Sequence, residues 1–310
     1  MDALRVEAAG LLTTVQDLGR LNAIAAGVPP GGAMDRFAHS AANLLAGNDV
    51  RAATLECTLT GPRLVAERSC LVAITGADFD PRVNGEPAPM WTGIFLSAGD
   101  RLTLASRRSG ARAYVALAGG VAADRWLGSQ STYLLASRGG MRGRALVAGD
   151  VIATAAGPGS RAVTGRELHR HLRPDYGDHA LRVIAGPHID RLGRDGRDAF
   201  FTSVFTVSHQ ADRMGYRLDG PELDTSGDEL LSFGLTAGVV QLPAGGKPIL
   251  LMADQQTVGG YPVIATVVRA SLPVAAQLAP GDELRFAEIA IEEALRILRE
   301  QESALDSLRD

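Results

Sequence analysis

The stretch Ala98-Gly-Asp-Arg-Leu-Thr-Leu104 indicates the fold of this chain, because close variants of it stand at two other places. These are Ala148-Gly-Asp-Val-Ile-Ala-Thr154 and Pro280-Gly-Asp-Glu-Leu-Arg-Phe286. In each case a Gly-Asp turn leads into a short strand. The repetition predicts related β-barrels in the two halves of the chain.

Short alternating apolar runs separated by glycine continue this pattern along the sequence. Such runs, with turn residues between them, are typical of sandwiches and barrels. Asn84-Gly85 is a favourable hairpin turn, because both residues tolerate positive φ. We therefore predict a mainly β fold of two barrel subdomains with a few helices. The clearest predicted strands are Leu71–Gly76, Ala113–Ala118, Val204–Val207 and Pro248–Met252.

Two helices stand out from this background. Asp35 is a suitable N-cap for a helix over Arg36–Ala46, and Gly47 would end it. A second helix over Ile289–Leu308 would carry an apolar stripe that packs on its own domain or, alternatively, on another subunit. A chain of 310 residues is long enough for two domains. We expect an N-terminal barrel-like subdomain at 1–155, a connecting segment at 156–179, a C-terminal barrel at 180–288 and a C-terminal helix at 289–310.

Composition excludes several classes of function. The net charge of -4 argues against a nucleic-acid partner. No apolar run is long enough for a membrane span, and Met1–Gly10 lacks the apolar core of a signal peptide, so we expect a cytoplasmic protein. Cys57 and Cys70 lie in apolar stretches and are expected to be buried thiols, and no zinc-ligand spacing occurs.

Two polar stretches near the N-terminus are candidates for chemistry. Gln16, Asp17 and Arg20 crowd the end of an apolar strand. Asp17 and Arg20 either form a local ion pair or present a carboxylate and a guanidinium to a small substrate. The glycine-rich loop Gly27–Asp35 leads into a helix N-terminus, where free N–H groups would favour an anion.

Two further polar stretches lie in the second half. Asp212 and Arg213 are adjacent within Ser208–Arg217, so in a strand their side chains would point to opposite faces. His209, beside them, is either a base near neutral pH or a solvated loop histidine. The fourth stretch, Met252–Pro262, places Asp254, Gln255, Gln256 and Thr257 directly after an apolar strand.

Polar side chains at the end of a buried strand need partners or access to a ligand, since each unpaired one costs about 1–3 kcal/mol. We therefore predict that Asp254, Gln256 and Thr257 line a cleft with Tyr261 and with Asp212 or Arg213. On this prediction, replacing Asp254 with Asn would abolish turnover and leave the melting temperature nearly unchanged. Gly245-Gly-Lys-Pro248 is not a phosphate-binding P-loop, because the first glycine and the Ser/Thr are missing.

Taken in order, seven segments resemble the allophanate hydrolase subunit 2, or KipA-like, family of biotin-dependent carboxyltransferase-like proteins. The resemblance runs from about residue 3 to residue 288. The segments are Gly10–Arg20, Gly27–Asp35, Ala42–Asn48, Thr75–Phe79, Gly128–Tyr133, Asp212–Leu218 and Asp254–Pro262.

The resemblance implies paired cyclophilin-like β-barrel subdomains, the first of them, at 1–155, a carboxyltransferase subdomain. The commonest assigned member of the family is the C subunit of the ATP-hydrolysing 5-oxoprolinase, an enzyme that opens the lactam of 5-oxoproline to glutamate. Such a protein works with a KipI-like B subunit together with a LamB/YcsF-type A subunit. ATP and Mg²⁺ would then belong to the complex, and phosphorylation of the lactam oxygen would make ring opening feasible.

On this hypothesis we assign the site residues as follows. Asp254 or Asp212 could hold Mg²⁺, and Arg213 or Arg20 would bind the substrate carboxylate. No metal site is otherwise assigned to this chain. The catalytic candidates are Asp254, Gln256, Asp212 and Arg213, and the substrate-binding candidates are Asp17, Arg20, Asp35, Thr257 and Tyr261.

The sequence departs from the family pattern at several positions. Leu21-Asn22 stands in place of Pro-Gly, and Ala211 in place of a serine. Phe233 replaces the usual glutamate and Gln255 an arginine. The loss of one acid and one base either removes a single salt bridge or alters the substrate.

Two other functions are compatible with the resemblance. One is the carboxyltransferase component of a biotin-dependent urea or amide carboxylase. Biotin would then sit on a separate carrier, because Lys247 is the only lysine and lacks a biotinylation setting. The other is a non-catalytic regulatory protein that binds a KipI-like partner.

Overall fold

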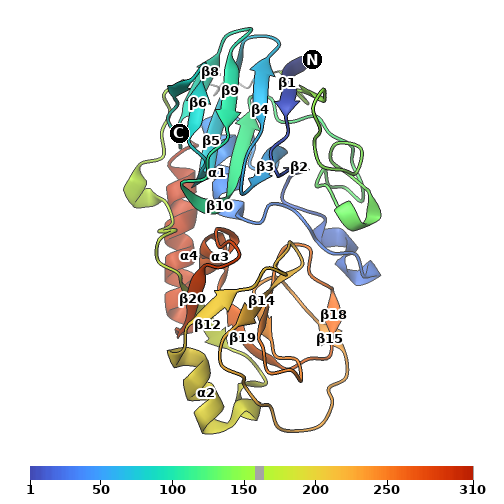
Figure 1. Cartoon of the computed structure of the whole chain (residues 1–310), viewed down its shortest axis with the longest axis vertical. Coiled ribbons are helices and arrows are strands. Elements are labelled where there is room, and N and C mark those ends of the chain that lie inside the picture. Colours follow the sequence, from blue (N-terminus) through green and yellow to red (C-terminus); the bar gives the residue numbers. More distant parts are fainter. Residues whose placement is uncertain (158–163, 310) are drawn as a thin grey trace. The chain divides into compact units, whose positions relative to one another are not determined.

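The computed structural model describes residues 1–157 and 164–309, which form two compact units (Figure 1). Unit 1 holds Met1–Arg20, Gly31–Arg173 and Gln301–Asp310, and unit 2 holds Leu21–Pro30 and Pro174–Glu300. Part of the predicted connecting segment, residues 158–163, lies outside the described residues. The subdomain boundaries taken from the sequence stay predictions.

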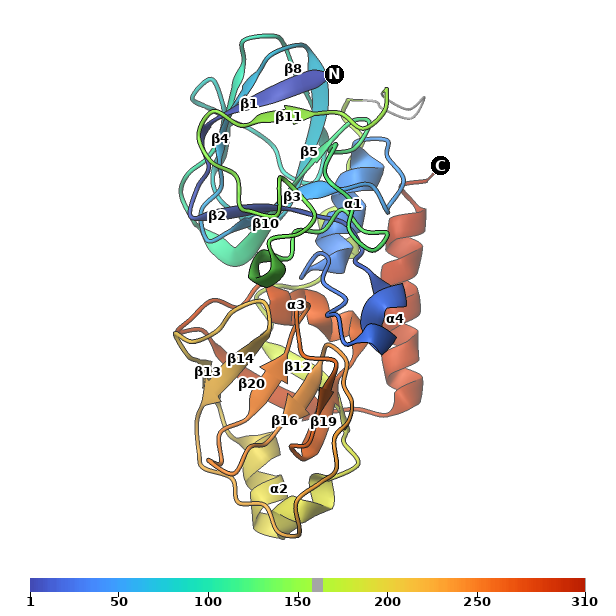
Figure 2. The ribbon, with the colours of Figure 1, turned by 90° about the vertical axis from the view of Figure 1, so that its right-hand side faces the viewer.

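Unit 1 is built from two antiparallel sheets around an apolar core (Figure 2). The larger sheet has the order β11-β1-β4-β9-β6-β7, and the smaller has the order β2-β3-β10-β5-β8. The strands are β1 (Asp2–Ala8), β2 (Leu12–Gln16), β3 (Thr54–Thr58), β4 (Arg63–Ala66), β5 (Cys70–Asp78), β6 (Pro81–Val83), β7 (Glu86–Pro87), β8 (Gly93–Leu96), β9 (Arg101–Leu104), β10 (Ser109–Leu117) and β11 (Val151–Ala153).

Helix α1 (Arg36–Leu45) packs against β5 and β10 of unit 1. It begins as predicted, because Oδ1 of Asp35 accepts a hydrogen bond from the N–H of Ala38 at 2.8 Å. It ends at Leu45, and Gly47, two residues further on, has a φ of 76° that only glycine adopts readily.

Unit 2 contains a closed barrel of seven strands in the order β12-β19-β16-β17-β14-β13-β20. The parallel pairing of β12 with β20 closes the ring, and the other neighbours are antiparallel. Beside the ring, β15 (Phe233–Gly234) and β18 (Val258–Gly259) form a two-stranded sheet. The barrel strands are β12 (Ala180–Ala185), β13 (Phe205–Val207), β14 (Gly215–Asp219), β16 (Val239–Gln241), β17 (Ile249–Leu251), β19 (Val263–Val267) and β20 (Glu283–Glu288).

The remaining α-helices belong wholly or partly to unit 2. Helix α2 (Gly193–Thr202) packs against β20, and α3 (Leu272–Ala276) packs against β12 (Figure 2). The last helix, α4 (Ile291–Asp306), belongs to unit 2 up to Glu300 and to unit 1 from Gln301. Among the described helices, none combines the length and the apolar character that a membrane crossing requires.

The mainly β prediction is confirmed, and the three Gly-Asp turns share one geometry. Asp100, Asp150 and Asp282 each accept a hydrogen bond from the N–H three residues earlier, at 2.7–2.8 Å. The preceding glycines all have φ of about 91° or 90°. Two of the turns precede β9 and β11 of unit 1, in which the strands form two sheets. The third precedes β20 of the closed barrel in unit 2. The sequence did not predict α2, whose glycine-rich and charged sequence lacks a helical apolar stripe.

The smaller predictions also hold. Asn84 and Gly85, with φ of 53° and 91°, form the tight turn between β6 and β7. Cys57 and Cys70 are buried free thiols, and burial raises their pKa values to about 12 and about 11.

Candidate functional site

Asp17, just after β2, is the centre of a buried polar cluster in unit 1. Its side chain, which is 8% exposed, accepts hydrogen bonds from the hydroxyls of Ser129 and Ser131, both at 2.6 Å. It also accepts from the N–H groups of Gln130 at 2.6 Å and Gly19 at 2.8 Å. Burial alone would raise the pKa of Asp17, but these hydrogen bonds outweigh it and the pKa lies below its ordinary value. Two segments of the family resemblance, Gly10–Arg20 and Gly128–Tyr133, are thus joined by one ionised carboxylate.

Arg20 also contacts the segment that follows Trp126, through one hydrogen bond and two aromatic rings. Its guanidinium, 2% exposed as a residue, donates through Nη2 to the carbonyl oxygen of Ser131 at 2.5 Å. It lies 5.1 Å from the ring centroid of Trp126 and 5.7 Å from that of Tyr133. Asp17 and Arg20 therefore both contact the segment 126–133. Their assignment to substrate binding stays a prediction, and the structure supplies both with partners inside the protein.

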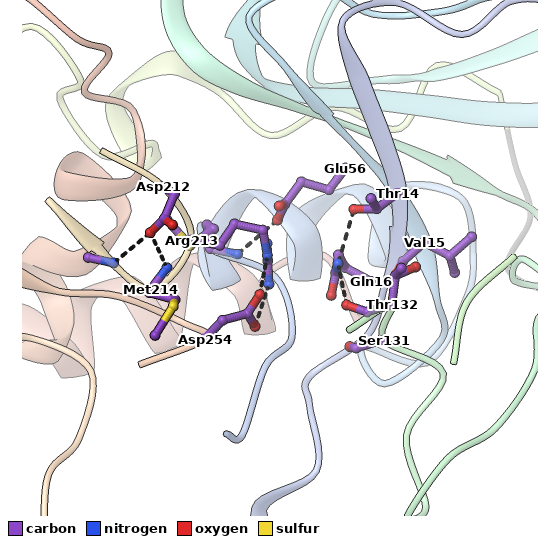
Figure 3. Close-up of polar contacts among 12 residues, drawn as sticks. Thr14, Val15, Gln16, Glu56, Ser131, Thr132, Asp212, Arg213, Met214 and Asp254 are labelled. Atoms are coloured by element: carbon purple, nitrogen blue, oxygen red, sulfur yellow. Dashed lines mark hydrogen bonds and ion pairs between the residues drawn. The ribbon is translucent and has the colours of Figure 1, made fainter. Parts of the chain in front are cut away.

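Gln16 completes this cluster from within β2. Its Nε2 donates to Thr14 Oγ1 at 3.0 Å and to the carbonyl oxygen of Thr132 at 3.3 Å (Figure 3). The side chain is fully buried, and its Oε1 has no hydrogen-bond partner among the described residues.

The glycine-rich loop before α1 is divided between the units, with Gly27–Pro30 in unit 2 and Gly31–Asp35 in unit 1. Gly32 has φ of 90°, and a Cβ on it would lie 2.9 Å from the backbone nitrogen of Gly19. The N–H of Ala33 donates to the carbonyl oxygen of Asp17 at 2.9 Å. This part of the loop therefore packs against the turn after β2, and the carboxylate of Asp35 caps α1.

Glu56 and Tyr114 form a buried pair that the sequence did not single out. They lie directly opposite each other on β3 and β10, with exposures of 1% and 0%. The Tyr114 hydroxyl donates to Glu56 Oε2 at 2.8 Å and accepts from the N–H of Asp35 at 2.8 Å. Burial, with the nearby carboxylates of Glu56 and Asp35, raises the pKa of Tyr114 well above its ordinary value. In Thr54–Thr58, Glu56 alternates with Leu55 and Cys57, a pattern that predicts a solvent-facing side chain, so the sequence offered no signal for this pair.

Replacing Tyr114 with Phe is expected to lower the free energy of unfolding by about 1–3 kcal/mol, since the N–H of Asp35 loses its acceptor and Glu56 loses a donor. Urea unfolding at neutral pH measures the loss. Tyr261, which is 48% exposed, gives the matched control: Tyr261→Phe should stay within about 0.5 kcal/mol of wild type. Equal stability of Tyr114→Phe and wild type would contradict a stabilising role for the buried hydroxyl.

In unit 2, an ion pair between Arg213 and Asp254 joins the two polar stretches predicted there. Arg213 Nε lies 2.8 Å from Asp254 Oδ2, and Nη2 lies 3.2 Å from Oδ1, so the guanidinium binds both carboxylate oxygens (Figure 3). The residues are 8% and 6% exposed. The N–H of Asp254 also donates to the carbonyl oxygen of Arg213 at 2.8 Å. The pair therefore fixes the turn after β17 against the turn before β14.

Asp212 and Arg213 lie in a turn and not in a strand, so the expectation for a strand does not apply, and their side chains bind different partners. The exposed carboxylate of Asp212 accepts from the N–H groups of Met214 at 2.8 Å and Gly215 at 3.2 Å, and so caps its own turn (Figure 3). His209 is exposed.

The other predicted residues of the fourth stretch differ in burial. Gln256 is exposed, Tyr261 is 48% exposed and Thr257 is 6% exposed. Gly27 faces Thr257 within unit 2, since a Cβ on Gly27 would lie 4.0 Å from Thr257 Oγ1. A common cleft for these side chains stays a prediction. The expectation that Asp254 can be replaced without loss of stability does not fit its buried ion pair.

The two replacements of family residues are accommodated separately. Phe233 packs on the apolar cluster of Leu235, Val239, Leu251 and Val263, and its ring centroid lies 5.5 Å from that of His188. Gln255 is 1% exposed, and its amide nitrogen, turned toward the backbone, donates to the carbonyl oxygens of Met252 at 2.5 Å and Ala253 at 3.1 Å.

The residues do not fit a Mg²⁺ site of this chain's own. Within residues 1–157 and 164–309, no three His, Cys, Asp or Glu side chains gather as a metal site would require. Both carboxylate oxygens of Asp254 are bound by Arg213, and Asp212 caps a turn. The expectation that one of these aspartates holds the metal therefore finds no support in the geometry.

Comparison with known proteins identifies relatives that match nearly the whole chain. The family model described as "Carboxyltransferase domain, subdomain A and B" matches residues 26–288. The chain is 38% identical to the C subunit of 5-oxoprolinase from Escherichia coli, over 98% of this chain and 97% of that protein. It is 33% identical to the corresponding C subunit from Haemophilus influenzae, over 96% and 94% of the two chains.

A solved structure extends the comparison to the fold. The crystal structure of Kluyveromyces lactis urea carboxylase matches with a TM-score of 0.92 and 28% identity, over 99% of this chain and 29% of that longer chain. The match covers both units, so the relation includes the barrel and the paired sheets. The chain therefore belongs to the carboxyltransferase-domain family defined by subdomains A and B.

Proposed function

We propose that this chain is the C subunit of an ATP-hydrolysing 5-oxoprolinase, which converts 5-oxoproline to glutamate together with its A and B subunits. The observation that carries the proposal is the match, at 38% identity, along nearly the whole length of a protein of that name. Urea carboxylase, in contrast, contains the matching region as less than a third of a much longer chain. The more similar relative is thus a separate component of an enzyme, and we carry this role over to the present chain.

The chemistry of a lactam defines what the protein must supply. Overall, the carbonyl carbon gains the oxygen of one water, the ring C–N bond breaks, the nitrogen takes up both protons of that water as an ammonium group, and a second carboxylate is formed. Hydrolysis of ATP in the complex drives this ring opening. The enzyme therefore needs hydrogen-bond donors for the carbonyl oxygen and a partner for the substrate's carboxylate. We place the substrate at the turn after β17, where Gln256, Thr257 and Tyr261 would contact it.

Arg213 and Asp254 act as positioning residues in this proposal. Their bidentate ion pair would hold the turn that carries Gln256 in one conformation. Asp212 has an exposed carboxylate, so among the predicted catalytic carboxylates it is the one that a substrate can reach. Asp17, Arg20 and Asp35 would act within unit 1, where the contacts described above hold its polar segments together.

ATP and Mg²⁺ belong to the complex in this proposal. Residues 245–248 lack the P-loop pattern, and Lys247 is paired with Asp219 at 2.8 Å. We therefore assign nucleotide binding to the two partners in the cytoplasm, a KipI-like B subunit together with a LamB/YcsF-type A subunit.

Reconstitution tests the proposal directly. The chain, purified with A and B subunits of the same organism, should release glutamate only when ATP and 5-oxoproline are both present. Omission of this chain should abolish the release. The 5-oxoprolinase of Escherichia coli, assayed in parallel, serves as a positive control, and an inactive reconstitution beside that active control would remove the assignment.

The similarity to urea carboxylase supports a second candidate, a carboxyltransferase for urea or an amide. Transfer of labelled carboxylate from a biotin carrier protein to urea, without glutamate release, would select this function. Tight binding to the B subunit without activity in either assay would indicate a regulatory protein.

A further inference from the structure

Gln241 is a buried amide with an unused hydrogen-bond donor. It lies on β16 in unit 2 and is 1% exposed, yet its Nε2 has no hydrogen-bond partner among the described residues. A buried donor without an acceptor is unfavourable, and in a native protein it needs a reason. A polar side chain that destabilises the ligand-free fold is typical of a binding residue.

The acceptor of the same side chain is held only weakly. Gln256 Nε2 donates to Gln241 Oε1 at 3.5 Å, at the long limit of a hydrogen bond. Gln256 is exposed, so it can move without the loss of buried contacts. Both polar atoms of Gln241 are therefore available to a ligand that replaces this long hydrogen bond.

Gly259 makes room for these two amides. A Cβ on Gly259 would lie 2.7 Å from Gln256 Nε2 and 3.2 Å from Gln241 Nε2. Its φ is not positive, so the backbone conformation does not demand glycine, but a side chain here would have to shift the ends of both amides. The two carboxamides and this glycine of β18 thus form one small polar group.

Apolar side chains surround this polar group. Gln241 is two residues after Val239 on β16 and so shares its strand face. That face carries the cluster of Leu235, Val239, Leu251 and Val263, with Phe233 packed against it. A Cβ on Gly259 would also lie 2.8 Å from Leu235 Cδ1, so the amides and the apolar cluster adjoin.

We propose that Gln241 is a specificity residue that binds the cis-amide edge of a lactam or urea. Such an edge presents a C=O and an N–H on the same side. The ligand oxygen would accept from Gln241 Nε2, and the ligand N–H would donate to Gln241 Oε1 in place of Gln256. This inference rests on the proposed function for its choice of 5-oxoproline as the physiological ligand.

The chemistry of the side chain favours an amide over other ligands of similar size. A carboxylate offers only acceptors, so it would leave Oε1 facing another oxygen. A cyclic secondary amide satisfies the donor and the acceptor of Gln241 together, with its ring against the apolar cluster. Gln241 thereby distinguishes a lactam from its ring-opened product, a carboxylate.

Calorimetric titration of the full chain, alone and assembled with the A and B subunits, tests this assignment. The probes are 2-pyrrolidinone, 5-oxoproline and urea, with N-methyl-2-pyrrolidinone as the analogue that lacks the N–H. Wild type should bind 2-pyrrolidinone at least about tenfold more tightly than the N-methyl analogue. In Gln241→Met the preference should disappear, while the melting temperature stays equal or rises, because the unpaired donor is gone.

Gln277→Met is the matched control, since Gln277 is also a buried glutamine of unit 2, 3% exposed. It should bind every probe as wild type does. Gly259→Ala is a second variant that places a methyl group 3.2 Å from Gln241 Nε2, the donor that the ligand oxygen must reach, and it should weaken lactam binding. Gln241→Met with wild-type lactam affinity, or a wild type with no preference for the N–H, would overturn the inference.

The two proposals fail in different ways. If the wild-type complex releases no glutamate but Gln241 still determines binding of 2-pyrrolidinone or urea, the proposed function is wrong and the amide site stands. If the complex is active and Gln241→Met retains both KM and binding, the amide site is wrong and the proposed function stands.

Discussion

Replacing Arg213 with Met should lower the free energy of unfolding by about 3–5 kcal/mol, because it leaves the Asp254 carboxylate buried and uncompensated. Asp254 is 6% exposed and accepts from Arg213 through both oxygens, so solvent does not substitute for the lost partner. Replacing Asp254 with Asn should also be destabilising, since an amide presents an N–H group to the guanidinium. Chemical unfolding at pH 7 measures both changes.

The double variant Arg213→Met, Asp254→Leu is expected to recover most of the loss, because an apolar pair removes the unpaired charge. The exposed pair of Lys247 and Asp219, 2.8 Å apart, provides the control, and Lys247→Met should change stability far less than Arg213→Met does. If Arg213→Met and Lys247→Met lowered the free energy of unfolding equally little, the ion pair of Arg213 and Asp254 would not hold the turn after β17.

Replacing Asp17 with Ala should lower the free energy of unfolding by about 3 kcal/mol or more, because two backbone N–H groups and two serine hydroxyls lose a shared acceptor. Gly19, Ser129, Gln130 and Ser131 all donate to this carboxylate, and the last three lie more than a hundred residues away in the sequence. Asp49→Ala is the control, since Asp49 is exposed and its carboxylate accepts from the N–H of Arg51, two residues further on. A similar loss from both variants would argue against a special role for Asp17.

The lowered pKa of Asp17 also predicts how the free energy of unfolding depends on pH. Its folded-state pKa is below the unfolded value of about 3.9, so the unfolded chain binds the proton first as the pH falls. Its contribution is therefore fully present above the unfolded pKa and is lost as the pH falls toward the folded pKa. Between pH 5 and pH 3, wild type should lose more stability than Asp17→Asn, and parallel curves would exclude this linkage.

The sequence predicted the fold from local features that the structure retains. The Gly-Asp turns, the Asp35 cap and the Asn84-Gly85 hairpin depend on a few neighbouring residues, so their geometry is encoded locally. Helix α2 was missed because Gly193–Thr202 contains two glycines and four charged residues, and only Phe200 is buried. Its helical state depends on packing against β20, which local propensity does not report.

The candidate site was predicted in part. The polar stretches were found, but their partners were not, because contacts such as Asp17 with Ser129 join distant parts of the chain. Glu56 was overlooked because it alternates with Leu55 and Cys57 as a solvent-facing residue would, and Gln241 because it is one position in the apolar run 239–242. A polar residue in such a run is itself a signal, since burial without a partner is unfavourable.

The path of the chain through the two units constrains how the protein can be made and divided. Unit 1 includes Gln301–Asp310, in which Leu308 is buried and its carbonyl oxygen accepts from Arg166 Nη1 at 2.7 Å. The ribosome synthesises these residues after all of Pro174–Glu300, so unit 1 cannot gain its last contacts before unit 2 has been translated. A fragment that stops at Arg173 would lack this closing segment, and trimming the C-terminal helix would loosen the domain that begins the chain.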